Sequence, residues 1–198
     1  IGMYERFLDP SSGLLHQAKG FFEDPEKITE DHWGRGNGWG YFALTILVRD
    51  LPKTNAYRGK AEAYYKDLSL SLLRHQNRHG VWRPDIECEY AWDECSATAF
   101  IAFGMGVGLR LGLLERETFE APFERAIHAM TERFIDADFS TKMCCSGCLC
   151  PGEGEDRGTT KAYVTEQYPR INDPHSFAPM MFALTEAYRH GITDLEPW

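Results

Sequence analysis

The fold of this chain is constrained most by an alternation of apolar and amphipathic helical segments, with no strand-like pattern between them. Three apolar segments begin near residues 37, 95 and 179, and each follows a long polar loop. Two amphipathic segments, at about 57–76 and 118–135, follow short turns. Apolar helices are buried in a domain, and amphipathic helices cover them. This pattern is typical of an α/α toroid, in which the inner helices all begin at one rim, although a helical bundle with functional loops would look similar.

We therefore predict that residues 1–198 form a single all-α domain, part of an α/α barrel. A further short helix is expected to end near Leu8. The loops that precede the three apolar helices are dense in Trp, Arg, His and carboxylate side chains. If the three helices begin at one rim, these loops meet at one mouth. The side chains gathered there would be Trp33, Arg35, Asn37, Trp39, Trp92, Asp93, Glu94, Asn172, Asp173 and His175.

The densest group lies in residues 33–39, directly ahead of the first apolar helix, with two indoles, a guanidinium, an amide and three glycines. Flat aromatic faces suit the C–H faces of a sugar, and an Arg side chain binds a carboxylate in a bidentate manner. A helix N-terminus adds free N–H groups and the positive end of the helix dipole. The segment therefore predicts a site for a flat, oxygen-rich, anionic ligand. The alternative is a helix start with two buried tryptophans.

Two further groups offer acid–base chemistry. Asp93 and Glu94 form a carboxylate pair beside Trp92, whose ring could desolvate a carboxyl group and raise its pKa. Adjacent residues point in different directions, so this pair cannot flank one bond, and either residue could instead cap the following helix. Asp173 and His175 could form a His–carboxylate couple, or Asp173 could cap the last helix.

The net charge of −9 argues against nucleic acid and anionic membranes as partners, because both favour basic surfaces. No apolar run approaches the length of a membrane span. Four of the six cysteines lie within residues 144–150, and Cys145-x-x-Cys148 has the spacing of a zinc knuckle. A second pair at matching spacing is absent, so we predict no metal, no cofactor and reduced cysteines in a cytoplasmic protein. The alternative is a metal-binding module on this cysteine loop.

The segment Trp33-Gly34-Arg35-Gly36-Asn37-Gly38-Trp39 resembles the signature of unsaturated glucuronyl and rhamnogalacturonyl hydrolases, glycoside hydrolase families 88 and 105. The likeness extends in order along the chain, through residues 13–16, 94–99, 108–114 and 172–179. It implies an (α/α)6 barrel, of which this chain supplies roughly the C-terminal half. It also implies that His16 and the signature residues Trp33, Arg35, Asn37 and Trp39 line a sugar site.

The resemblance further implies a reaction on oligosaccharides that carry an unsaturated uronic acid, derived from pectin or rhamnogalacturonan. Such enzymes hydrate the C4=C5 double bond with the help of a carboxylate. The main acid–base Asp of the family has no counterpart in residues 1–198, so we expect it upstream of Ile1 and expect this chain alone to be inactive. The missing half of the barrel would come from an N-terminal half or from a second copy of the chain. A non-catalytic carbohydrate-binding or interaction module is the competing hypothesis.

Overall fold

A computed structural model describes residues 1–147, 150–166 and 168–195. Among these residues the secondary structure is helical, apart from isolated β-bridges between loop segments. The elements are α1 (Gly2–Phe7), α2 (Gly34–Asp50), α3 (Arg58–Arg74), α4 (Cys95–Arg110), α5 (Arg116–Phe134), the 3-10 turn η1 (Gly154–Asp156), α6 (Thr160–Thr165) and α7 (Pro174–Arg189). The all-α prediction is confirmed. Every described helix is too short or too polar to cross a bilayer.

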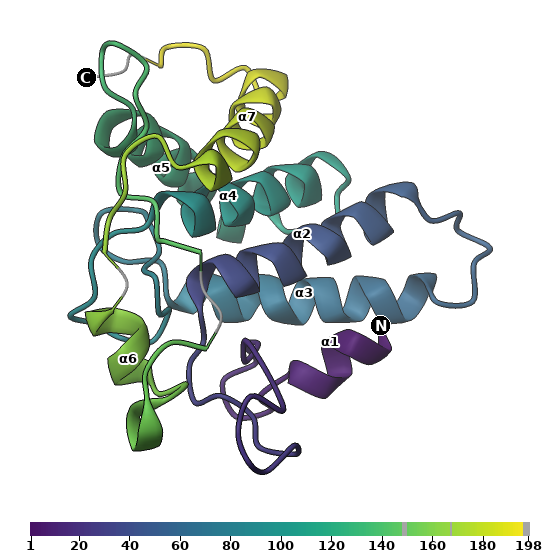
Figure 1. Cartoon of the computed structure of the whole chain (residues 1–198). Coiled ribbons are helices and arrows are strands. Elements are labelled where there is room, and N and C mark those ends of the chain that lie inside the picture. Colours follow the sequence, from purple (N-terminus) through teal and green to yellow (C-terminus); the bar gives the residue numbers. More distant parts are fainter. Residues whose placement is uncertain (148–149, 167, 196–198) are drawn as a thin grey trace.

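The three apolar helices α2, α4 and α7 lie side by side and run in the same direction (Figure 1). Along α2 and α4 the facing residues rise together, Gly34 with Ala97, Gly38 with Phe100 and Tyr41 with Gly104. Along α4 and α7, Phe103 lies beside Phe182 and Gly106 beside Glu186. The central helix α4 is buried from Cys95 to Leu109. The amphipathic helices α3 and α5 cover α2 and α4, as the alternation in the sequence predicted.

Small residues on α4 let its neighbours approach closely. A Cβ atom at Gly104 would overlap the ring of Tyr41, and one at Gly108 would overlap the hydroxyl of Tyr65. The Tyr65 hydroxyl donates a hydrogen bond to the Gly104 carbonyl at 2.6 Å, and its ring stacks on that of Tyr41 at 5.1 Å. The spacing of these glycines therefore fixes how α2 and α3 pack against α4.

Because the inner helices are parallel, their N-termini share one rim, and the loops 18–33 and 77–94 gather there with the described parts of 135–173 (Figure 1). The structure corrects two element boundaries on this rim. α2 begins at Gly34 rather than near residue 37, and α7 begins at Pro174 rather than Pro179. The short helix α6 lies within a segment that the sequence predicts as a loop.

Candidate functional site

Trp33 caps the N-terminus of α2, and its segment pairs with the loop before α4. The Gly34 N–H donates to the Pro84 carbonyl at 2.7 Å, and an antiparallel bridge joins Trp33 to Asp85. A Cβ at Gly34 would overlap the carbonyl oxygen of Arg83, so only glycine allows this close approach. The first glycine of the signature therefore serves packing at the rim.

Arg35 points into the protein and is only 1% exposed. Its Nε donates to Ser96 Oγ at 2.9 Å, and its Nη2 contacts the carbonyl and, at 2.9 Å, the Sγ of Cys145. The guanidinium thus connects α2 to α4 and to the cysteine loop. In this geometry a substrate carboxylate cannot reach Arg35 unless the loop at Cys145 moves, so the structure favours a positioning role over a direct clamp.

Glu94 is fully buried and caps α4, which is the alternative reading of this residue from the sequence. Its carboxylate accepts from the N–H groups of Ser96 at 3.1 Å and Ala97 at 2.6 Å. It also accepts from the Cys145 N–H at 2.9 Å. Arg35 and Glu94 therefore both hold Ser96 and the cysteine loop, and neither Glu94 oxygen is free to act as a catalytic base.

Asn37 is fully buried and ties α2 to the segment that carries His16. Its Oδ1 accepts from the Leu15 N–H at 2.8 Å, and its Nδ2 donates to the Leu15 carbonyl at 2.9 Å and the Trp33 carbonyl at 3.1 Å. The side chain acts like a strand partner for Leu15. The bonds to Leu15 hold the neighbouring His16 in place. The Asn37 amide is fully engaged by these bonds, so it does not bind a sugar directly.

The two signature tryptophans differ in exposure. Trp33 is 9% exposed and packs with Cys145 and Tyr163, with the half-buried Trp92 against them. Trp39 is 48% exposed, and its ring lies 4.4 Å from that of Phe100. Of the two indoles, only Trp39 offers a broad free face to a ligand.

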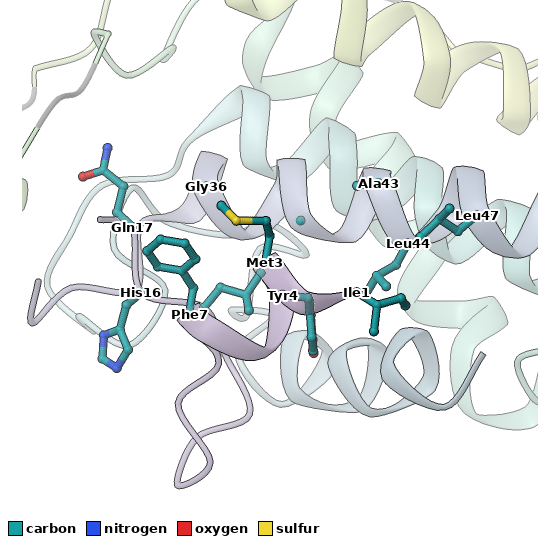
Figure 2. A pocket seen from close by; sticks show the side chains of 12 residues that line it. Ile1, Met3, Tyr4, Phe7, His16, Gln17, Gly36, Ala43, Leu44 and Leu47 are labelled. Carbon is teal, nitrogen blue, oxygen red and sulfur yellow. The ribbon is translucent and has the colours of Figure 1, made fainter. Parts of the chain in front are cut away.

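A groove of about 280 Å³ runs between α1 and α2, along the side of α2 that carries Gly36 and Gly40. Its walls are mainly apolar, and His16 and Gln17 lie together at the end remote from Leu47 (Figure 2). Burial and the neighbouring His32 lower the pKa of His16 below its usual value, so its imidazole is neutral at neutral pH. The groove thus joins an apolar channel to a polar end at the signature.

The carboxylates on the α4 and α7 side of the rim are held by partners. Asp93 forms ion pairs with His79 at 3.0 Å and Arg133 at 2.6 Å. Although burial opposes it, hydrogen bonds from these groups hold the pKa of Asp93 below its usual value. Asp173 caps α7 and accepts from His175 Nδ1 at 2.7 Å, while the His175 side chain remains about half exposed. Among the predicted residues of this rim, Trp39, Asn172 and His175 are exposed, whereas His16, Trp92 and Asp93 are partly buried.

Sequence reasoning missed two buried carboxyl groups beside the signature, Asp31 and Asp85, each at most 1% exposed. Asp31 Oδ2 accepts from the Trp33 N–H at 2.8 Å. Asp31 Oδ1 and Asp85 Oδ2 have no hydrogen-bond partner among the described residues. Burial, with a smaller contribution from the charge of Asp85, raises the pKa of Asp31 to about 7. The sequence offered one hint, that Asp31 stands two residues before Trp33. That spacing alone does not distinguish a buried carboxyl group from an exposed loop residue.

In the described part of the cysteine loop, Cys144, Cys145, Ser146 and Cys150 are buried. Cys95, Cys144 and Cys145 are fully buried thiols, and burial raises the pKa of the Cys95 thiol well above its usual value. Cys148, the second member of the predicted zinc-knuckle spacing, lies outside the described residues. The Glu94, Cys95 and Cys144 side chains meet closely enough to hold an ion. The Glu94 oxygens already accept hydrogen bonds, and the raised pKa of Cys95 disfavours the thiolate that binds metals, so the chemistry of this trio does not favour a metal.

Comparison with known proteins agrees with the resemblance seen in the sequence. The model of a family described as Glycosyl Hydrolase Family 88 matches residues 1–190. An unsaturated 3S-rhamnoglycuronyl hydrolase from Formosa agariphila is 31% identical over 102 residues, covering 50% of this chain and 27% of the relative. An enzyme of the same name from an Alteromonas species is 28% identical over 127 residues, covering 63% of this chain and 31% of the relative.

Two solved structures share the fold. One is a possible member of family GH105 from Salmonella enterica, with a TM-score of 0.81 and 23% identity, covering 94% of this chain and 47% of the other. The second is a family 105 glycoside hydrolase from C. acetobutylicum, with a TM-score of 0.81 and 22% identity, covering 94% of this chain and 55% of the other. The chain thus spans about half the length of these structures and less than a third of the curated relatives.

Proposed function

This chain belongs to glycosyl hydrolase family 88, and on that premise we propose that it is the sugar-binding half of a hydrolase for oligosaccharides ending in an unsaturated uronic acid. The reaction adds water across the C4=C5 double bond, with the proton going to C4 and the hydroxyl to C5. The resulting hemiketal opens and releases the neighbouring sugar. The sugar class of the substrate is pectin- or rhamnogalacturonan-derived in this proposal.

The observation that supports the proposal most directly is the exposed Trp39 on α2. The groove lined by His16 runs along the same helix. A sugar ring could stack on the indole, since aromatic faces attract the C–H faces of a pyranose. Neutral His16 offers a hydrogen bond to a hydroxyl or ring substituent. Asn37 holds the His16 segment in place, and Arg35 with Glu94 holds the rim behind it. In this proposal, sugar binding by this chain depends on Arg35, Asn37 and Glu94 holding the loops of the rim in place.

We further propose that additional helices complete the barrel against this chain. The side of α7 leaves three large apolar side chains uncovered, Phe177, Met181 and Phe182, which are 46%, 63% and 40% exposed. Helices of the same polypeptide are the occupants we propose, because this chain covers 47% of the Salmonella structure. A second copy of the chain is the other outcome that the oligomeric state of the intact protein would reveal.

Kinetics on the intact protein test the proposal. An unsaturated galacturonyl disaccharide should lose the absorbance of its double bond when the protein is added. Replacing Trp39 with Ala should raise KM by roughly 10-fold, corresponding to about 1–2 kcal/mol of lost stacking. Tyr57→Ala is the matched control, because Tyr57 is 63% exposed and lies ahead of α3, at the opposite end of the inner helices. Absence of turnover on unsaturated disaccharides of every uronic acid tried would refute the function.

A carbohydrate-binding module without catalysis remains the second candidate. It is favoured by the state of Asp93, Glu94 and Asp173, since each is tied up in ion pairs or helix caps. If this candidate is correct, the intact protein binds the disaccharide and leaves its double bond unchanged.

A further inference from the structure

A compact cluster of ligating side chains lies at the polar end of the groove, where Asp9 and His32 converge on His16. One ligand atom from each of the three lies within 4.8 Å of the others. The two imidazole rings face each other with their centroids 4.7 Å apart. These residues are 7 and 16 positions apart in the sequence, so no metal-binding motif announces them.

The surroundings of His32 match those of a metal ligand. Its Nδ1 lies 2.6 Å from Glu87 Oε2, and its Nε2 faces Asp9 Oδ2 at 3.4 Å. A His that ligates a metal almost always donates its other N–H to a carboxylate or carbonyl, which fixes the tautomer and orients the ring. With Nδ1 against Glu87, the Nε2 of His32 faces Asp9 Oδ2 and, at 3.5 Å, Ser12 Oγ.

The separation of Asp9 and His32 also fits an ion between them. A charge-assisted hydrogen bond between these groups would be about 2.7–2.9 Å long. Two ligands of a tetrahedral zinc ion, each about 2.05 Å from it, lie roughly 3.3 Å apart. The 3.4 Å between Asp9 Oδ2 and His32 Nε2 therefore matches a ligand-to-ligand edge of such an ion.

The other two ligands are prepared in a similar way. The Asp9 carboxylate is oriented by Ser11 and Ser12, whose hydroxyls donate to it at 2.7 Å. The buried Nδ1 of His16 has no hydrogen-bond partner among the described residues. Asp9 and His16 are only partly buried, so an ion can reach the site from solvent.

We propose that Asp9, His16 and His32 form a binding site for a divalent transition metal ion, with zinc as the best match, and that Glu87 supports it from behind His32. Three protein ligands leave a fourth position for water or a ligand oxygen. The proposal does not rest on the glycosidase function, because its readout is metal binding to the protein alone.

Titration with Co²⁺ tests the site, since four-coordinate Co²⁺ gives visible absorption bands and Zn²⁺ should displace it. Tag-free protein should bind one Co²⁺ with micromolar or tighter affinity near neutral pH. His16→Gln and His32→Gln should each weaken binding by about 100-fold, and Glu87→Gln by about 10-fold or more. His128→Gln, on α5, is the matched control and should bind as the wild type does.

Circular dichroism distinguishes loss of the site from loss of the fold in each variant. The proposal is overturned if the folded wild-type protein gives no Co²⁺ bands and binds no Zn²⁺. It is equally overturned if folded His32→Gln binds as tightly as the wild type, or if His128→Gln loses as much affinity as His16→Gln. A zinc-dependent rise in melting temperature that is absent from His16→Gln would support it.

Discussion

Replacing Asp31 with Asn should remove a pH-dependent loss of stability from this protein. The Asp31 side chain is completely buried beneath the signature, and one of its oxygens lacks a hydrogen-bond partner among the described residues. Burial is the main reason that its pKa rises from 3.8 to about 7, and the charge of Asp85 adds to the shift. The folded protein therefore holds a proton that the unfolded chain releases at a lower pH.

The sign and size of the effect follow from this shift. Below about pH 4 the carboxyl group is protonated in both states and costs nothing. As the pH rises from about 4 to 7, the unfolded chain ionises first, so the free energy of unfolding falls; above about pH 7 the loss is complete. A shift of about 3 pKa units corresponds to about 4 kcal/mol at most. Between about pH 5 and pH 8 the loss attributable to Asp31 is therefore about 2–3 kcal/mol.

Urea denaturation followed by tryptophan fluorescence measures this directly. Asn retains an oxygen that can accept from the Trp33 N–H, so Asp31→Asn preserves that contact at 2.8 Å. The stability of the variant relative to the wild type should rise by about 2 kcal/mol or more from pH 5 to pH 8. Asp67→Asn, on the exposed side of α3, should follow the wild-type pH profile. Parallel profiles for Asp31→Asn and the wild type would refute the reasoning.

Two further substitutions test the rim. Gly34→Ala should lower the free energy of unfolding in urea by about 2 kcal/mol or more, because the new Cβ overlaps the Arg83 carbonyl. Gly59→Ala is the control, since position 59 has open space, and it should be neutral or stabilising by up to about 1 kcal/mol. Equal effects of the two substitutions would contradict the close approach at Gly34. Asn37→Ala should lower the free energy of unfolding by about 2–3 kcal/mol, because it leaves the buried Leu15 N–H and carbonyl without their partner. A melting curve like that of the wild type would show that this amide is dispensable.

The sequence was sufficient for the fold class because periodicity reports burial. The helices around residues 37–51, 57–76, 95–113 and 118–135 exist close to the predicted ranges, and their inner and outer roles are as predicted. The errors have local causes. The sequence placed residues 34–36, two of them glycines, ahead of the first apolar helix, although tight packing against the next loop makes glycine the residue that fits at position 34 within it. Pro179 lies inside α7, whose true start is Pro174 behind the cap Asp173.

The candidate site was predictable in its composition and less so in its geometry. The residue types of the signature indicated a sugar site, but they could not reveal that Arg35 and Asn37 point inward while Trp39 points out. Orientation depends on contacts with Ser96 and Leu15, which are distant in the sequence and carry no spacing signal. The convergence of Asp9, His16 and His32 is hidden for the same reason.

Our central proposal is that this chain carries sugar-binding surface, while Asp93, Glu94 and Asp173 are engaged in ion pairs or helix caps. Calorimetric titration of the 198-residue chain with an unsaturated galacturonyl disaccharide, with the double-bond absorbance followed in the same samples, tests it most directly. The account predicts binding that is weakened in Trp39→Ala and an absorbance that stays constant. Loss of the absorbance with the chain alone, or the absence of any binding by the folded chain, would contradict it.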